Sequence, residues 1–107
     1  MQPRTDHVFK SLSDPTRRSL FERLCREGEL TVWELTEDSG VSQPAVSKHL
    51  GQLKSAGLVR DRRHGRETHY SAEPKALKPL VDWLGFYAAF WRQKFDALED
   101  LLRRMDQ

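Results

Sequence analysis

Residues 31–55, TVWELTEDSGVSQPAVSKHLGQLKS, decide the fold because they contain two helix starts a short distance apart. Thr31 is an N-cap residue, and Glu34 three positions later completes a capping box. Ser42 is the N-cap of the second helix. We expect the first helix to end at Gly40, just before that cap. Two short helices joined by a tight turn form a helix-turn-helix.

The second helix of this pair has an apolar side and a polar side. At about 100° per residue, Val46 and Leu50 fall on one face and are expected to be buried. The opposite side carries small residues, which let the helix backbone come close to whatever it meets. Gln43 can make paired hydrogen bonds to an adenine edge in the major groove, and Lys48 can reach guanine or a phosphate. This face is therefore typical of a helix that reads DNA.

The segment that follows changes to the alternating pattern of β-strands. Residues 58–71 read LVRDRRHGRETHYS, and His64-Gly65 marks a tight turn between two strands. The basic tip of this β-hairpin suits a minor groove or flanking phosphates. A helix-turn-helix over 31–56 followed by such a hairpin is a winged helix. We therefore expect a mainly α fold with a two-stranded β-hairpin wing.

The segment SDPTRRSLFERLCREG, before the helix-turn-helix, predicts a complete helix. Asp14 is its N-cap, Pro15 occupies the first helical position and Gly28 ends it. Leu24 and Cys25 continue an apolar stripe along this helix. We therefore expect Cys25 to be a buried, inert thiol.

The last part of the chain predicts one long helix, over about residues 79–106. Its apolar residues recur at steps of three or four in two stripes, which form a wider surface than so small a domain can cover. We expect a second copy of the chain to cover the rest in a two-fold dimer. A short first helix, which Thr5 or Asp6 could cap, carries the apolar residues Val8, Phe9 and Leu12. The residues expected in that interface, from the first and last helices, are Val8, Phe9, Leu12, Leu84, Tyr87, Trp91, Phe95, Leu98 and Leu102.

The positive charge is concentrated in one segment, although the net charge of the chain is only +2. Between residues 48 and 69 the Lys and Arg residues outnumber the acids by four, whereas between 82 and 107 the acids are in excess by one. Such a distribution is typical of a nucleic-acid footprint. The expected DNA-binding residues are Ser42, Gln43, Pro44, Ser47, Lys48, His49, Arg62, Arg63, His64 and Arg66. His49 lies near the core edge, so a structural role and a DNA contact both stay open for it.

The length of 107 residues fits one domain, residues 1–107. No stretch approaches the roughly 20 apolar residues that span a bilayer. The N-terminus lacks the apolar core of a secretory signal, and the one cysteine cannot form a disulfide within the chain. We therefore expect a cytoplasmic protein without a membrane partner. No nucleophile–base pair or phosphate-binding glycine loop is found, so we expect no enzyme and no cofactor.

The chain resembles the ArsR/SmtB-type winged-helix transcriptional repressors of bacteria. LSDPTRRSLFERL is similar to the family's opening helix, VSQPAVSKHLGQLKSAGLV to its recognition helix, and RHGRETHYS to its wing. The resemblance implies a homodimer joined through the first and last helices. Each subunit would insert its recognition helix into the major groove of a palindromic operator and act as a repressor.

The resemblance also allows the family's metal sites to be compared with this chain. The family's cysteine pair falls on Thr31 and Trp33, and no histidine follows His69 for the site on the last helix. We therefore expect no metal at the known sites. Three alternatives stay open: release of DNA by a small organic ligand held among the aromatic residues of the last helix, release by oxidation at Cys25, and a winged-helix module that binds a protein instead of DNA.

Overall fold

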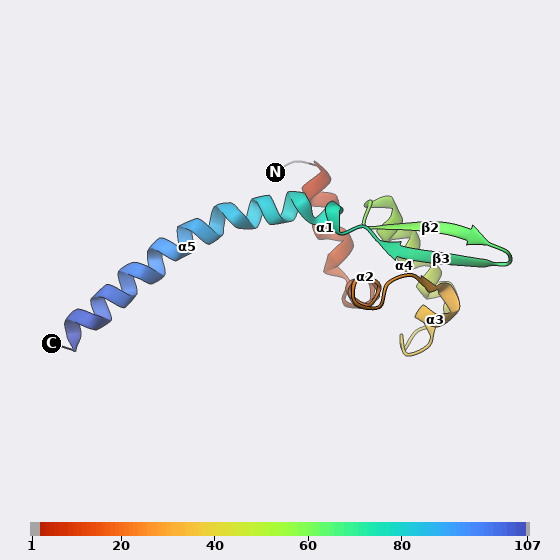
Figure 1. The fold of residues 1–107 in the computed structure, drawn as a ribbon, viewed down its shortest axis with the longest axis horizontal. Coiled ribbons are helices and arrows are strands. Elements are labelled where there is room, and N and C mark those ends of the chain that lie inside the picture. Colours follow the sequence, from red (N-terminus) through yellow and green to blue (C-terminus); the bar gives the residue numbers. More distant parts are fainter. Residues whose placement is uncertain (1–2, 107) are drawn as a thin grey trace.

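The structure, a computed structural model, describes residues 3–106. Five α-helices, one 3₁₀ helix and three short strands make up this part of the chain (Figure 1). In chain order they are α1 (Pro3–Ser13), α2 (Pro15–Glu27), β1 (Leu30–Thr31), α3 (Val32–Thr36), α4 (Gln43–Ser55), β2 (Val59–His64), β3 (Glu67–Ala72), η1 (Pro74–Leu77) and α5 (Lys78–Met105). The predicted fold class, mainly α with a β-hairpin wing and a long last helix, is confirmed.

Three helices begin at the caps that the sequence predicts. The Asp14 carboxylate accepts a hydrogen bond from the Arg17 amide at 2.9 Å, with Pro15 in the first turn of α2. Thr31 and Glu34 form the complete capping box of α3. The Ser42 hydroxyl accepts from the Ala45 amide at 3.3 Å at the start of α4. These caps satisfy amide hydrogens that have no partner within the helix.

Helix α3 ends at Thr36, so its predicted end at Gly40 is wrong. The Arg23 guanidinium of α2 donates to the carbonyl oxygens of Glu34 and Glu37 at 3.0 and 3.1 Å. These bonds satisfy carbonyls of the last turn of α3, which have no partner within the helix. Asp38 then turns the chain with a positive φ of 65°. The Ser39 amide donates to the Thr36 carbonyl at 3.1 Å, so a tight turn directly follows the helix and ends it before Gly40.

The sheet contains one strand more than the predicted hairpin. Its order is β1-β3-β2, with both pairs antiparallel, and Leu30 of β1 lies opposite Tyr70 of β3. In the hairpin, His64 pairs with Glu67, so the turn residues are Gly65 and Arg66. The predicted turn at His64-Gly65 is therefore displaced by one residue. Gly65 has a φ of 64°, which suits the first turn position of a two-residue hairpin.

The core lies between α1, α2, α3, α4 and the base of the sheet. Val8 of α1 is 1% exposed there. It therefore has no surface left for a partner subunit, which differs from the predicted interface role. The buried apolar residues are Val8, Leu20, Phe21, Leu24, Leu30, Leu35, Val46, Leu50, Leu53, Leu58 and Val59.

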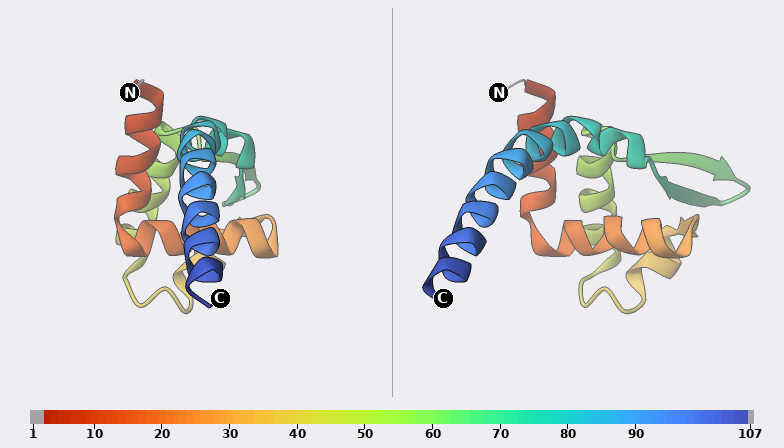
Figure 2. Two further views of the ribbon diagram at one scale, coloured as in Figure 1. Left: turned by 90° about the vertical axis from the view of Figure 1, so that its left-hand side faces the viewer. Right: turned by 60° about the vertical axis from the view of Figure 1, so that its left-hand side comes forward.

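Helix α5 starts against α1 and then extends away from the other elements (Figures 1 and 2). The Phe9 and Trp83 rings meet edge to face with their centroids 5.2 Å apart, and Leu80 packs against the core. None of the residues of α5 is buried. The longest axis, 69 Å, runs from the C-terminal end of α5 to the tip of the β2–β3 hairpin (Figure 1). The apolar side chains of α5 are therefore exposed in the single chain.

The Cys25 side chain is exposed, so the prediction that it is buried is wrong. It lies beyond the edge of the stripe formed by Leu20, Phe21 and Leu24. Partial desolvation raises the pKa of its thiol, and the Glu22 carboxylate adds to the effect.

Among the helices described, none has the length and apolar character needed to cross a membrane.

Candidate nucleic-acid interface

Helix α4 keeps its apolar side in the core and leaves its polar side to solvent. Val46, Leu50 and Leu53 are all 0% exposed. This anchoring fixes the rotation of the helix about its axis, and so determines which side chains face outward. The predicted DNA contacts of this helix that are exposed are Ser42, Gln43, Pro44, Ser47 and Lys48.

His49 lies on the side of α4 that faces α2. It is half-buried, and its Nδ1 accepts a hydrogen bond from the Arg17 Nε at 3.4 Å. Arg17 also donates to the Ser11 carbonyl at 3.2 Å, so it links α1, α2 and α4. The amide of Arg17 in addition holds the pKa of the Asp14 carboxyl below its ordinary value. The geometry therefore favours the structural role of His49. Sequence reasoning missed Arg17, because its partner is far away in the chain.

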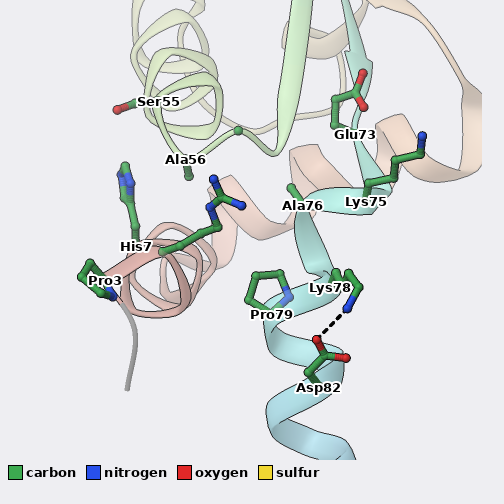
Figure 3. A pocket seen from close by; sticks show the side chains of 12 residues that line it. Pro3, His7, Ser55, Ala56, Glu73, Lys75, Ala76, Lys78, Pro79 and Asp82 are labelled. Atoms are coloured by element: carbon green, nitrogen blue, oxygen red, sulfur yellow. Dashed lines mark hydrogen bonds and ion pairs between the residues drawn. The ribbon is translucent and has the colours of Figure 1, made fainter.

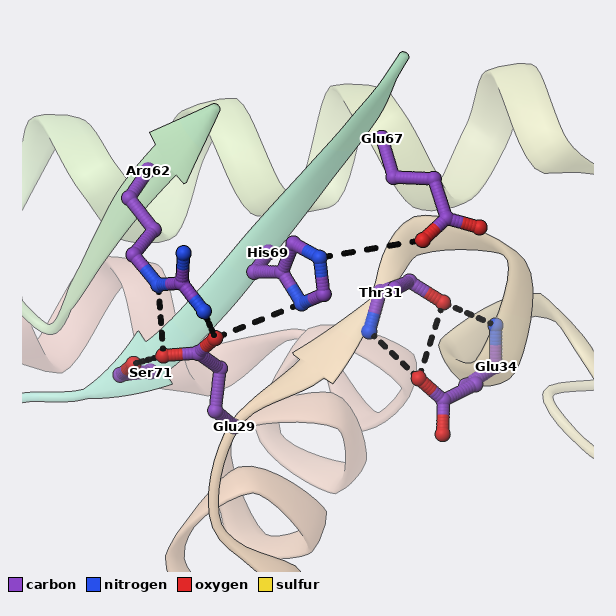
Figure 4. Close-up of polar contacts among 7 residues, drawn as sticks. All are labelled: Glu29, Thr31, Glu34, Arg62, Glu67, His69 and Ser71. Carbon is purple, nitrogen blue, oxygen red and sulfur yellow. Dashed lines mark hydrogen bonds and ion pairs between the residues drawn. The ribbon is translucent and has the colours of Figure 1, made fainter. Parts of the chain in front are cut away.

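The Arg62 guanidinium forms an ion pair with Glu29, the residue directly before β1. It meets the Glu29 carboxylate at 2.6 and 3.2 Å (Figure 4). Ser71 donates to the same carboxylate at 3.3 Å, and the His69 Nδ1 lies 3.3 Å from it. The hydrogen bond from Arg62 holds the pKa of Glu29 below its ordinary value and raises the pKa of Arg62 in turn. The sequence predicts a DNA contact for Arg62, whereas the structure ties it to the base of the sheet.

Arg63 projects to the opposite face of the hairpin, because successive residues of a strand alternate between faces. It is exposed, as are His64 and Arg66 at the tip. Within residues 3–106, Arg63, Arg66 and Lys48 of α4 take part in no ion pair. Lys54, by contrast, pairs with Asp61 at 3.0 Å. Three cations at this surface are thus available for phosphates.

A groove separates α4 from the tip of the wing. Gln43 and Ser47 line it from α4, and Arg66 lines it from the wing. The remaining lining residues are Thr31, Val32 and Trp33 at the start of α3 and Glu67 and Thr68 in β3. Two predicted contacts of the helix and one of the wing therefore share a single surface. Sequence reasoning did not connect them, because the groove depends on how the hairpin folds back beside α4.

A second cleft lies near the opposite end of α4, between α1 and the start of α5 (Figure 3). Three of its charged groups are paired: Lys78 with Asp82 at 2.9 Å, and Glu73 with Arg60 at 2.9 Å. Its lining mixes polar and apolar residues and does not include the aromatic residues of α5 beyond Asp82. Across the described part of the chain, no group of three or more His, Cys, Asp or Glu side chains is arranged to hold a metal ion.

Comparisons with known proteins agree on the family. Residues 14–61 match the model of the bacterial regulatory proteins of the arsR family. The chain is 47% identical over 82 residues to the arsenic resistance transcriptional regulator ArsR1 of Pseudomonas putida, covering 70% of this chain and 64% of that protein. It is 35% identical over 79 residues to the transcriptional repressor SdpR of Bacillus subtilis, covering 74% of this chain and 87% of the repressor.

A solved structure gives the same result for the fold. The ArsR-like transcriptional regulator from Rhodococcus sp. RHA1 superimposes with a TM-score of 0.71 at 31% identity, over 92% of both chains. The superposition thus extends well beyond residues 14–61, which match the family model. The chain therefore belongs to the ArsR family of bacterial regulatory proteins.

Proposed function

We propose that this chain is a sequence-specific, DNA-binding transcriptional repressor that acts as a homodimer on a palindromic operator. The observation that carries the proposal is the surface shared by α4 and the wing. There a capped helix with small outward side chains lies beside Lys48, Arg63 and Arg66, none of which has an ion-pair partner in residues 3–106. The repressor named among the relatives supports the direction of regulation.

The α4 residues supply the sequence readout in this proposal. Gln43 makes paired hydrogen bonds to a base edge, with adenine preferred, and Lys48 reaches guanine or a phosphate. Ser42, Pro44 and Ser47 allow close approach of the helix to the groove. His49 supports the helix through Arg17 and does not read bases.

The wing residues supply binding that does not depend on sequence. Arg63, His64 and Arg66 contact phosphates or the adjacent minor groove. Arg62 has a different role, because its guanidinium is held by Glu29 at 2.6 Å. It braces the hairpin against β1 and so keeps the other basic residues in position.

The homodimer forms through α1 and α5. Phe9 and Leu12 remain part of the interface, together with the exposed apolar stripe of α5, whereas Val8 belongs to the core. The stripe consists of Leu84, Tyr87, Trp91, Phe95, Leu98 and Leu102. Two-fold symmetry then presents two α4 helices to half-sites about one helical turn apart.

We do not assign the arsenic response named for ArsR1 to this chain. Soft metal ions require several thiolate ligands, and each chain supplies Cys25 alone. The hydroxyl of Thr31, at one position of the family's cysteine pair, already accepts from the Glu34 amide at 3.1 Å. The raised pKa of Cys25 also weighs against an oxidation switch, because the thiolate is the reactive form.

The test is selection of bound duplexes from random DNA, followed by affinity measurements at about 0.15 M salt. The selected duplex is expected to bind far more tightly than a random one. Gln43→Ala should lower this preference by about 1–3 kcal/mol. Arg63→Ala should weaken binding to both duplexes alike and lower the salt slope by about 1.

Arg26→Ala is the matched control, because Arg26 is exposed on α2 away from the groove. It should bind both duplexes as the unmodified chain does. Equal affinity of the unmodified chain for selected and random duplexes would remove sequence-specific regulation. That result would favour the alternative of a winged-helix module that binds a protein.

A further inference from the structure

We propose that the groove between α4 and the wing seats one sugar-phosphate strand of the DNA, with the Trp33 indole packed against a deoxyribose. The inference rests on the proposed function and extends it, because Trp33 lies outside both the recognition helix and the wing. It adds a third contact surface, the start of α3, to the two that the sequence predicts.

The first observation is the position of Trp33 between the two DNA-contacting elements. Helix α3 packs against both α4 and β3. Its first turn lines the same groove as Gln43 and Ser47 of α4 and Arg66 of the wing. A strand that enters this groove therefore lies within reach of α3, α4 and the wing at once.

The second observation follows from the shape of duplex DNA. The proposed function sets α4 in a major groove and the wing tip at the adjacent minor groove. One sugar-phosphate strand always separates a major groove from the neighbouring minor groove. That strand must pass between α4 and the wing, which is where the groove runs. With α4 in the major groove and the wing at the minor groove, the occupant of the groove between them is a sugar-phosphate strand.

The third observation is that Trp33 is 63% exposed, although the preceding Val32 packs against the core and nearby Leu35 is 0% exposed. The interface proposed for α1 and α5 lies away from α3, because α5 leaves the molecule on the side opposite to α3 (Figures 1 and 2). An indole offers a flat apolar face for a deoxyribose ring and one N–H that can donate to a phosphate oxygen. Both properties match a sugar-phosphate strand.

The charges around the groove are compatible with a phosphate. Arg66 is exposed and has no ion-pair partner within residues 3–106. Glu67, the acid in the lining, has its carboxylate 3.8 Å from the His69 Nε2 (Figure 4). The Glu34 carboxylate turns back to accept from the Thr31 amide at 3.0 Å. The Arg66 guanidinium is thus free to meet the strand, and the Glu34 carboxylate is turned away from it. The exposed Glu67 carboxylate lies at the side of the groove and forms no hydrogen bond with His69.

The experiment compares Trp33→Ala, Trp33→Phe and Trp33→Arg in the full chain. Each variant is titrated with the duplex selected by the unmodified chain and with a random duplex of the same length, over a range of salt concentrations. Trp33→Ala should bind both duplexes about fivefold more weakly, because apolar contact with a sugar carries no sequence information. Trp33→Phe should lose less. Trp33→Arg should steepen the salt slope by about one unit, because an added cation at a phosphate releases one more counterion.

Circular dichroism of each variant provides the control for folding, and the exposure of Trp33 predicts unchanged spectra. If the unmodified chain prefers its selected duplex and all three variants match it in affinity and salt slope, the inference fails while the proposed function stands. A loss confined to the selected duplex would also overturn it, since Trp33 would then read bases. If the unmodified chain shows no preference between the duplexes, the proposed function fails and the inference falls with it.

Discussion

The elements before residue 78 and helix α5 differ in how far their apolar side chains are buried and in how their helices begin. The first group buries every residue of the apolar core, and α2, α3 and α4 each begin at a side-chain cap. Helix α5 buries none of its residues and begins at Leu77 without a side-chain cap. It nevertheless has apolar side chains along its whole length, among them Trp91 at 54% and Phe95 at 61% exposure.

This difference indicates that the winged-helix part and α5 are stabilised in different ways. The winged-helix part closes its own core, so its stability is a property of one chain. The apolar surface of α5 is the kind that marks an interface, because monomers rarely expose so large a continuous apolar patch. Changes in the first part should therefore alter unfolding, and changes in α5 should alter association.

The largest expected effect is on the core of the winged-helix part. Leu50→Ala removes a side chain that is 0% exposed and leaves a cavity between α4 and its neighbours. We expect the free energy of unfolding to fall by about 2–5 kcal/mol, measured by chemical denaturation. Gln52→Ala, at an exposed position of the same helix, should change it by less than about 0.5 kcal/mol. Equal effects of the two substitutions would contradict the assignment of the α4 faces.

The next effect separates association from folding. Leu98→Glu introduces a charge into the apolar stripe of α5, where it must be desolvated in the dimer. Sedimentation equilibrium should show dimer affinity lowered more than tenfold, about 1.4 kcal/mol or more. The far-ultraviolet circular dichroism spectrum of the variant should show that the winged-helix part remains folded.

Asp96→Ala is the matched control for this change. Asp96 lies on the polar side of α5, away from the stripe, and forms no ion pair among the described residues. It should leave the mass of the assembly unchanged. If Leu98→Glu remained a dimer of unaltered affinity, α5 would not be the interface.

The smallest expected effect concerns pH and the brace of the wing. Arg62 holds the pKa of Glu29 below the ordinary value of 4.5, so the pair stabilises the fold above about pH 4.5. That contribution is lost as the pH falls through the lowered pKa. Glu29→Gln should therefore show a shallower fall in the free energy of unfolding below pH 4.5 than the unmodified chain. Glu22→Gln, without an ion pair in residues 3–106, should keep the original slope.

Local signals predicted most of the helix boundaries. Asp14, Thr31 and Ser42 act on amides three residues away, and Gly28 ends α2 at a φ of 84°. Such contacts lie within one turn of helix, so they can be read from adjacent letters. The same holds for the two-residue turn of the hairpin, apart from its displacement by one position.

What the sequence did not predict depends on residues far apart in the chain. β1 pairs with β3 across about forty residues, and Arg62 finds Glu29 across 33. The Arg17–His49 contact spans 32 residues. A local pattern contains no information on these distances, because they are set by how the helices and the sheet pack. For the same reason the role of Arg62 in the candidate site became visible only in the structure.

The central claim is that two chains, joined through α5, read one palindromic operator with α4 and the wing. It is tested most directly by sedimentation of the protein with a labelled duplex selected from random DNA, at about 0.15 M salt. We predict two chains bound to each palindrome, and a random duplex of the same length left largely unbound at the same protein concentration. One chain per palindrome, or equal binding of the random duplex, would contradict the claim.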